Sequence, residues 1–168
     1  MGFTLILGGA RSGKSTFAQK EAEAAGGSLV MIATAEAMDR EMSERIARHR
    51  AERGPAWRTV EAPIDLAHAI VGLKDSDSAV VDCLTLWVSN LLMRGMNVGA
   101  ETGGLIAALE ACPARLWLIS NETGMGIVPE NALARSFRDE AGRLHQRLAA
   151  KAAQVKLIVA GLPLTLKG

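Results

Sequence analysis

The 168-residue sequence predicts an α/β fold in a single domain, residues 1–168, whose mostly parallel sheet carries helices on both faces. Two observations predict this fold. Short, almost continuous apolar runs alternate with longer segments of helical periodicity, which is typical of parallel strands that are buried on both sides. The first apolar run, residues 3–7, leads directly into a glycine-rich loop and then into a helical segment, residues 16–25.

The glycine-rich loop, residues 8–15, reads GGARSGKS and matches the phosphate-binding pattern G-x-x-x-x-G-K-[ST] through Gly8, Gly13, Lys14 and Ser15. Backbone N–H groups of such a loop converge on a phosphate, and the helix N-terminus adds partial positive charge. Lys14 is placed to reach the β- and γ-phosphates, and the Ser15 hydroxyl to bind Mg²⁺. The alternative is an ordinary glycine-rich turn. The strand before the loop and the helix after it favour a P-loop NTPase-like sheet that binds a nucleoside triphosphate.

Each further element is predicted from its local pattern. Apolar runs predict strands, apolar residues at helical spacing predict helices, and Gly26-Gly27 and Gly54-Pro55 mark breaks. The stretch 95–104, which begins and ends on glycine, is expected to form a loop. We expect the other strands at residues 28–34, 57–61, 78–82, 115–120, 155–160 and 164–167, and the other helices at residues 64–73, 84–93, 105–111 and 130–153.

The composition narrows the class of protein. A net charge of +1 with 22% charged residues argues against a protein that coats nucleic acid or a membrane surface. Cys83 and Cys112 match no metal-binding spacing, and their apolar neighbours predict buried free thiols in a reducing compartment. Residues 3–7 are too short for the core of a signal peptide, and no apolar run approaches the roughly 18 residues of a membrane span. We therefore expect a cytoplasmic enzyme or regulator.

Asp82 stands at the end of the buried strand predicted at residues 78–82. P-loop proteins place there a carboxylate that holds Mg²⁺ opposite the hydroxyl group of the loop. The alternative is that Asp82 caps the next helix, because aspartate is a favoured N-cap residue. Thr34 and Glu122 are expected to end neighbouring strands at the same edge of the sheet and to face the same crevice.

A basic helix is predicted within residues 36–53. At about 3.6 residues per turn, His49 lies on one face with the arginines four positions before and after it. Guanidinium groups around an imidazole suit polyphosphate binding, and neighbouring cations favour the neutral imidazole, which can attack phosphorus. The alternative is a solvated helix face with ordinary ion pairs. His68 and His145 are expected to be helix-face histidines without a chemical role.

The segment 121–131, NETGMGIVPEN, is rich in glycine and polar residues and directly follows a predicted strand. A loop of this kind at the edge of a parallel sheet suits substrate binding. The alternative is a connection whose glycines meet backbone requirements and whose Pro129-Glu130 starts the last helix. The residues alone leave both interpretations open.

Four segments together resemble one enzyme family. They are GGARSGKS, EMSERIARHRAERGPAWRTVEAP, VVDCLTLWVSNLL and SNETGMGIVPENALARSFRDEAGRLHQRLA, and the resemblance covers residues 5–167. The family is the bifunctional adenosylcobinamide kinase and adenosylcobinamide-phosphate guanylyltransferase of cobalamin biosynthesis. The resemblance implies phosphorylation of adenosylcobinamide by an NTP. It also implies transfer of GMP from GTP to the product, giving adenosylcobinamide-GDP and pyrophosphate.

The resemblance also implies roles for particular residues. The histidine that the family guanylylates matches His49, which would act beside Lys14, while Ser15 and Asp82 would bind Mg²⁺. GTP and ATP are the implied nucleotide substrates. The resemblance also implies a homo-oligomer, suggested to be a trimer, and no nucleic acid or membrane partner is expected. The implied nucleotide contacts are Gly8, Gly9, Ala10, Arg11, Ser12, Gly13, Lys14, Ser15, Thr34, Ala35, Glu36, Arg50, Ala51, Glu52, Arg53, Glu61 and Asp82.

Two other functions compete with the bifunctional enzyme. A kinase for another small alcohol would share the P-loop but would form no guanylylated protein. A nucleotide-dependent switch would normally carry an N-K-x-D motif, which this sequence lacks. Residues 139–142 match a loose D-x-x-G pattern, but they fall inside the predicted last helix. The bifunctional transferase is therefore the function that we predict.

Overall fold

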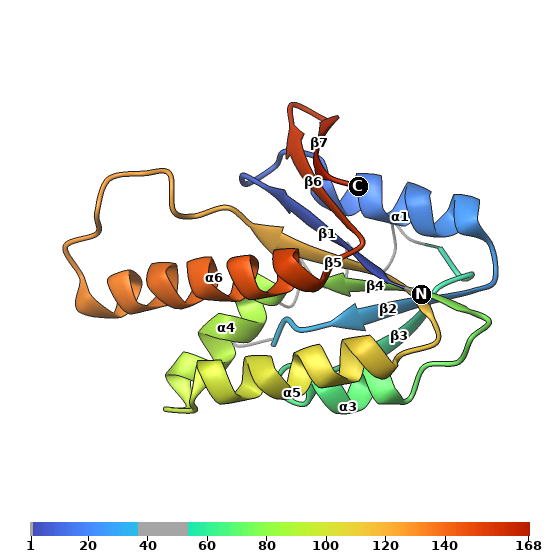
Figure 1. The fold of residues 1–168 in the computed structure, drawn as a ribbon, viewed down its shortest axis with the longest axis horizontal. Helices are drawn as coiled ribbons and strands as arrows, with labels where there is room; N and C mark the ends of the chain where they lie inside the picture. The colour runs from blue at the N-terminus through green and yellow to red at the C-terminus, as the bar shows by residue number, and fades with distance from the viewer. Residues whose placement is uncertain (1, 37–53) are drawn as a thin grey trace.

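Seven strands form one sheet in the order β3-β2-β4-β5-β1-β6-β7 in the computed structural model, which describes residues 2–36 and 54–168 (Figure 1). All neighbouring strands are parallel except β6 and β7, which confirms the predicted α/β fold. The strands are β1 (Phe3–Gly8), β2 (Ser28–Ala33), β3 (Arg58–Glu61), β4 (Asp77–Asp82), β5 (Arg115–Asn121), β6 (Gln154–Val159) and β7 (Leu162–Lys167). The helices are α1 (Lys14–Ala25), α3 (Leu66–Val71), α4 (Leu84–Met93), α5 (Val98–Ala111) and α6 (Ala132–Lys151).

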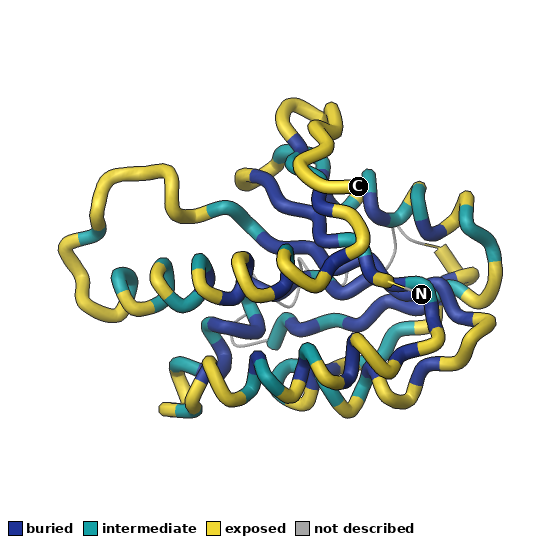
Figure 2. Tube along the Cα trace, viewed as in Figure 1, coloured by how far each residue is buried: buried dark blue, intermediate teal, exposed yellow. Residues whose placement is uncertain are grey.

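Alternate residues of the central strands enter two separate apolar cores. Leu5 of β1 packs in a core with residues of α3, α4, α5 and α6, whereas Ile6 packs in a second core with residues of α1. Val30 and Met31 of β2 divide in the same way. Helices therefore cover both faces of the sheet, as predicted, and Figure 2 shows the buried strands between the more exposed helices. None of the described helices is both long and apolar enough to cross a bilayer.

The helix α5 differs most from its prediction. It begins at Val98, whereas residues 95–104 were expected to form a loop, so that expectation was wrong for residues 98–104. The side-chain oxygen of Asn97 accepts a hydrogen bond from the backbone N–H of Ala100 at 3.0 Å, which caps the helix. Val98 and Thr102 are buried, so tertiary packing and the cap together outweigh the low helix propensity of the glycines.

The carboxyl end of β1 lies between β5 and β6 and leads into the P-loop. Gly8, the last residue of β1, pairs with Asn121, the last residue of β5. Asp82, the last residue of β4, pairs with Ala33, the last residue of β2. Because parallel strands end at a common edge, the residues that follow these four strands can act on one ligand there.

Removing the cap of α5 tests its contribution to stability. We expect Asn97→Ala to lower the free energy of unfolding by about 1 kcal/mol, because it leaves a helix N–H group without its side-chain acceptor. Urea denaturation measures the difference. Asn97→Asp keeps an acceptor at the same place and should stay close to the wild type. Equal stability of Asn97→Ala and the wild type would contradict the capping role.

Candidate nucleotide-binding site

The P-loop folds around the side chain of Lys14. The ammonium group donates a hydrogen bond to the carbonyl oxygen of Gly9 at 2.6 Å, and the side chain is buried. Burial lowers the pKa of Lys14, while electrostatic interactions with the acidic groups of Cys83 and Asp82 raise it by a smaller amount. A largely dehydrated ammonium group at the start of a helix is a strong electrostatic site for an anion.

Two glycines and a serine shape the inside of the loop. A Cβ atom on Gly8 would lie 2.6 Å from the carbonyl oxygen of Ile158 and 2.6 Å from Oγ of Ser12, and Gly13 has a φ of 96°, which disfavours other residues. The buried hydroxyl of Ser12 has no hydrogen-bond partner among the described residues. An unpaired buried hydroxyl is costly, so the Ser12 side chain suits a ligand oxygen such as that of a phosphate.

Ser15 and Asp82 lie together at the start of α1. Oγ of Ser15 donates a hydrogen bond to Oδ2 of Asp82 at 3.0 Å. The N-cap residue of α4 is Cys83 and has no side-chain cap, so the structure does not use Asp82 as a helix cap. Hydroxyl and carboxylate oxygens are ligands that Mg²⁺ prefers. The chemistry of these two oxygens therefore fits a Mg²⁺ ion. In the described ranges no three His, Cys, Asp or Glu side chains gather as a metal site.

Thr34 lies beside this site but its side chain is already bonded. Its hydroxyl donates to the carbonyl oxygen of Cys83 at 2.7 Å and accepts from the N–H of Cys83 at 2.9 Å, and the residue is fully buried. Thr34 and Glu122 follow β2 and β5, the two neighbours of β4, so both lie at the sheet edge where Asp82 ends β4, as expected. Because its hydroxyl is buried and bonded to Cys83, the side chain of Thr34 joins two strand ends and does not face a crevice.

The remaining predicted contacts extend along the edge. Ala35 is half-buried, and the carboxylate of Glu36 forms an ion pair with Arg94 at 2.7 Å. His49 and the predicted contacts 50–53 lie outside the described residues. The structure therefore brings the P-loop and Asp82 together, while those five positions stay predictions.

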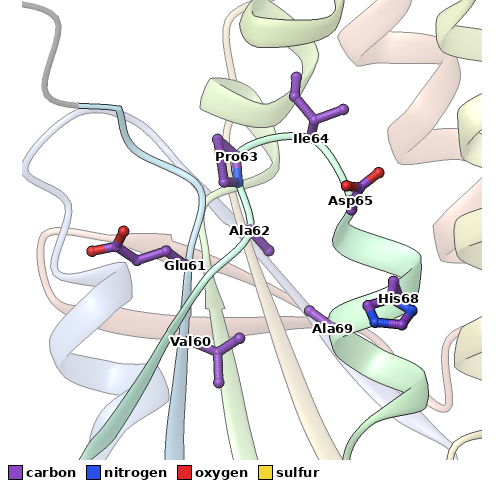
Figure 3. Close-up of a pocket in the computed structure, with 8 residues that line it drawn as sticks. All are labelled: Val60, Glu61, Ala62, Pro63, Ile64, Asp65, His68 and Ala69. Atoms are coloured by element: carbon purple, nitrogen blue, oxygen red, sulfur yellow. The ribbon is translucent and has the colours of Figure 1, made fainter.

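Glu61 ends β3 and lines a cavity of about 390 Å³ (Figure 3). Its carboxylate points away from the side chains of Asp65 and His68, which lie on the helical side of this cavity. Three strands, β2, β4 and β5, separate β3 from β1. At about 4.8 Å per strand spacing, Glu61 lies roughly 19 Å along the edge from the P-loop strand.

Sequence reasoning missed Asn90, a buried side chain within α4. Its amide group donates to the carbonyl oxygen of Thr34 at 2.8 Å and to that of Pro63 at 3.0 Å. This holds the segment after β2 against the turn that follows β3. An amide side chain inside the apolar run of residues 84–93 was the available signal, because a buried amide requires partners.

His145 lies on the buried face of α6, whereas His68 is exposed on α3. Nε2 of His145 lies 2.7 Å from the hydroxyl oxygen of Ser120, and Nδ1 lies 3.9 Å from a carboxylate oxygen of Glu122. Burial lowers the pKa of His145, and the charge of Glu122 opposes this shift. The backbone N–H of Glu122 donates to the carbonyl oxygen of Gly8 at 3.0 Å, so this cluster adjoins the P-loop strand.

Comparison with known proteins identifies the family. Residues 4–166 match the family model described as cobinamide kinase / cobinamide phosphate guanyltransferase. The chain belongs to this family. It is 47% identical over 167 residues to the bifunctional adenosylcobalamin biosynthesis protein CobP of Pseudomonas aeruginosa, covering 98% of this chain and 96% of that protein. It is 43% identical over 182 aligned positions to CobU of Salmonella typhimurium, covering 97% of this chain and 98% of that protein.

These matches confirm the resemblance stated from the sequence and place the chain among bifunctional transferases of cobalamin biosynthesis. Solved structures share the fold. The flagellar accessory protein FlaH of Methanocaldococcus jannaschii has a TM-score of 0.54 at 12% identity, covering 99% of this chain and 78% of that one. The P4 protein of bacteriophage phi6 in complex with ADP has a TM-score of 0.53 at 14% identity, covering 96% and 52%. At such identities the likeness establishes the P-loop NTPase-like fold alone.

The burial of His145 predicts a pH dependence of stability. Folding lowers the pKa of His145, so on acidification the imidazole is protonated in the unfolded chain before it is protonated in the folded protein. The free energy of unfolding therefore falls as the pH drops below about 6.5, and this fall ends once the pH is below the pKa of the folded state. We expect a smaller fall in unfolding free energy between about pH 7.5 and about pH 5.5 for His145→Gln than for the wild type. Chemical denaturation at both pH values measures it. The exposed-site variant His68→Gln should keep the wild-type fall, and an equal fall in His145→Gln would contradict the prediction.

Proposed function

We propose that this chain phosphorylates the aminopropanol hydroxyl of adenosylcobinamide with an NTP and then transfers GMP from GTP to the product through a guanylated His49. Membership of the family supports the pair of reactions. The observation in this chain that carries the proposal is the P-loop itself. It combines the buried ammonium group of Lys14, the unpaired hydroxyl of Ser12, and the Ser15 hydroxyl at 3.0 Å from Asp82.

In the kinase step, the substrate hydroxyl oxygen forms a bond to the γ-phosphorus while the bond from that phosphorus to the β-phosphate oxygen breaks. The NDP leaves with the electron pair of the broken bond, and the hydroxyl proton passes to solvent water. Lys14 and the backbone N–H groups of the P-loop hold the phosphate oxygens and offset their charge. Ser15 and Asp82 would hold Mg²⁺, which when bound neutralises charge on the β- and γ-phosphates.

In the guanylyl step, an imidazole nitrogen of His49 forms a bond to the α-phosphorus of GTP, and pyrophosphate leaves with the electron pair of the broken P–O bond. A phosphate oxygen of adenosylcobinamide phosphate then attacks the same phosphorus, the P–N bond breaks, and His49 is restored. The family resemblance and the arginines around His49 in the sequence support this assignment. The other predicted nucleotide contacts, including Glu61, belong to the same proposal.

The proposal extends to the setting of the enzyme. We place it in the cytoplasm as a homotrimer of single-domain chains, with ATP or GTP as the phosphoryl donor. The kinase for another small alcohol is the second candidate, because the P-loop alone fits it equally well. The two candidates differ in the alcohol that is phosphorylated, and only the bifunctional enzyme would form a guanylylated protein.

Labelling at the α-phosphate of GTP tests the guanylyl step. Wild-type protein should acquire label that acid removes and alkali does not, whereas His49→Ala should acquire none because the nucleophile is missing. Phosphorylation of adenosylcobinamide should persist in His49→Ala. His68→Ala, with an exposed histidine removed, is the matched control and should label like the wild type. Label that survives in His49→Ala would disprove the assignment of the nucleophile.

Mg²⁺ dependence tests the pair formed by Ser15 and Asp82. A chelator should abolish the kinase activity, and Asp82→Asn should raise the Mg²⁺ concentration for half-maximal rate by about tenfold, equivalent to about 1.4 kcal/mol of binding. A Mg²⁺ titration of the phosphorylation rate measures this. Asp65→Asn changes an exposed carboxylate away from the P-loop and should leave the titration unchanged. An unchanged midpoint in Asp82→Asn would rule out a metal role.

A further inference from the structure

The loop of residues 122–131 is fastened at both ends and free in its middle. At its start, the backbone N–H of Glu122 donates to Gly8 at 3.0 Å, and the carboxylate of Glu122 accepts from the N–H of Gly124 at 2.6 Å. At its end, the guanidinium group of Arg135 donates to the carbonyl oxygens of Pro129 at 2.9 Å and of Glu130 at 2.5 Å. The start of the loop is therefore held next to the P-loop strand, and its end is held to α6.

The middle of this loop presents apolar side chains to solvent. Ile127 is 97% exposed and Met125 is 81% exposed, and Val128 is also exposed. Figure 2 shows the loop as a mostly exposed arc that projects from the body of the molecule. Burying apolar surface is the main driving force of binding, so exposed apolar side chains on a loop that starts at the nucleotide-binding edge indicate a ligand or partner surface.

An apolar groove lies where this loop joins α6. It has a volume of about 330 Å³ between α4 and α6, and its lining includes Ser89, Leu92, Met93, Asn131, Leu133 and Phe137. Neither the groove lining nor residues 123–129 of the loop include a charged residue. Oδ1 of Asn131 caps α6 by accepting from Leu133 and Ala134, which fixes its amide group at the rim with the NH₂ group as a donor.

We infer that the loop 122–131 and this groove bind the corrin macrocycle of the acceptor, adenosylcobinamide, while its aminopropanol arm reaches the P-loop. This inference rests on the proposed function. A corrinoid has an apolar, methyl-bearing rim and uncharged peripheral amides, which match the apolar side chains and the donors of Asn131 and Ser89. The groove volume falls within the range of about 300–1,000 Å³ that small-ligand sites occupy.

The position of the loop 122–131 in the fold favours it as the corrinoid site over the exposed apolar surface of β7. Leu162, Leu164 and Leu166 on β7 are also exposed, but β7 forms the edge of the sheet beyond β6. The loop, in contrast, starts beside Gly8, at the carboxyl edge where the phosphates would bind (Figure 1). Ligands of open α/β sheets bind in the crevice outside the carboxyl ends of the strands.

The test separates corrinoid binding from nucleotide chemistry. Ile127→Ser and Leu133→Ser should each raise the KM for adenosylcobinamide by about tenfold, because each removes a large part of one buried apolar side chain from the complex. The KM for GTP and the labelling of the protein by α-labelled GTP should stay at wild-type values. The matched control is Leu164→Ser, because Leu164 is 56% exposed and Leu133 is 57% exposed, and it should leave all three quantities unchanged.

Three results would overturn the inference. The first is that the wild type turns over adenosylcobinamide and that Ile127→Ser and Leu133→Ser both keep the wild-type KM for it. The second is that light scattering shows a changed molar mass for these variants and that this change explains their lower activity. The surface would then be a contact between copies of the chain. The third is a wild type that neither binds adenosylcobinamide in equilibrium dialysis nor turns it over, which would overturn the proposed function as well.

Discussion

The hydrogen bond between Ser15 and Asp82 fixes the geometry on which the nucleotide site depends. It joins the first turn of α1 to the end of β4, although β5 lies between β4 and the strand that carries the P-loop. The helix therefore packs across β1, β5 and β4, and the P-loop is held between a strand end and a helix start. The N–H of Gly161, in the turn between β6 and β7, braces the opposite side by donating to the carbonyl oxygen of Ser12 at 2.8 Å.

Most polar side chains buried around this edge are satisfied within the protein. Thr34 bonds Cys83, Asn90 bonds two carbonyl oxygens, and the Asn121 amide donates to the hydroxyl of Thr85 at 3.2 Å. Such bonds fix the ends of the strands, because an unpaired group there would be costly. The hydroxyl of Ser12 is the exception among the described residues, and it lies inside the phosphate loop. An unsatisfied group in an otherwise satisfied network marks the place where a ligand supplies the missing bond.

Local patterns in the sequence predicted the strands, the P-loop and the position of Asp82, since each depends on periodicity or on a few adjacent residues. The order of the strands could not be predicted in this way, because it depends on contacts between residues far apart in the chain. The start of α5 depended on one cap, Asn97, which the surrounding glycines concealed. The burial of His145 depends on Ser120, a contact between residues far apart in the chain, and helical periodicity carries no information about such a partner.

Both reactions proposed for the enzyme take place at the same end of the acceptor, first at its hydroxyl and then at the phosphate that replaces it. A single site for the macrocycle can therefore serve both steps, provided that it lies outside the phosphate-binding loop and close to it. The loop 122–131 meets this condition, because its first residue, Glu122, bonds Gly8 through its backbone N–H and the apolar side chains follow further along the loop. The rigid P-loop then holds the nucleotide, while the acceptor is held by uncharged surface that does not compete for phosphate. On this proposal, the separation of charge from apolar surface explains why residues 123–129 of the loop carry no charge although the loop starts beside the P-loop strand.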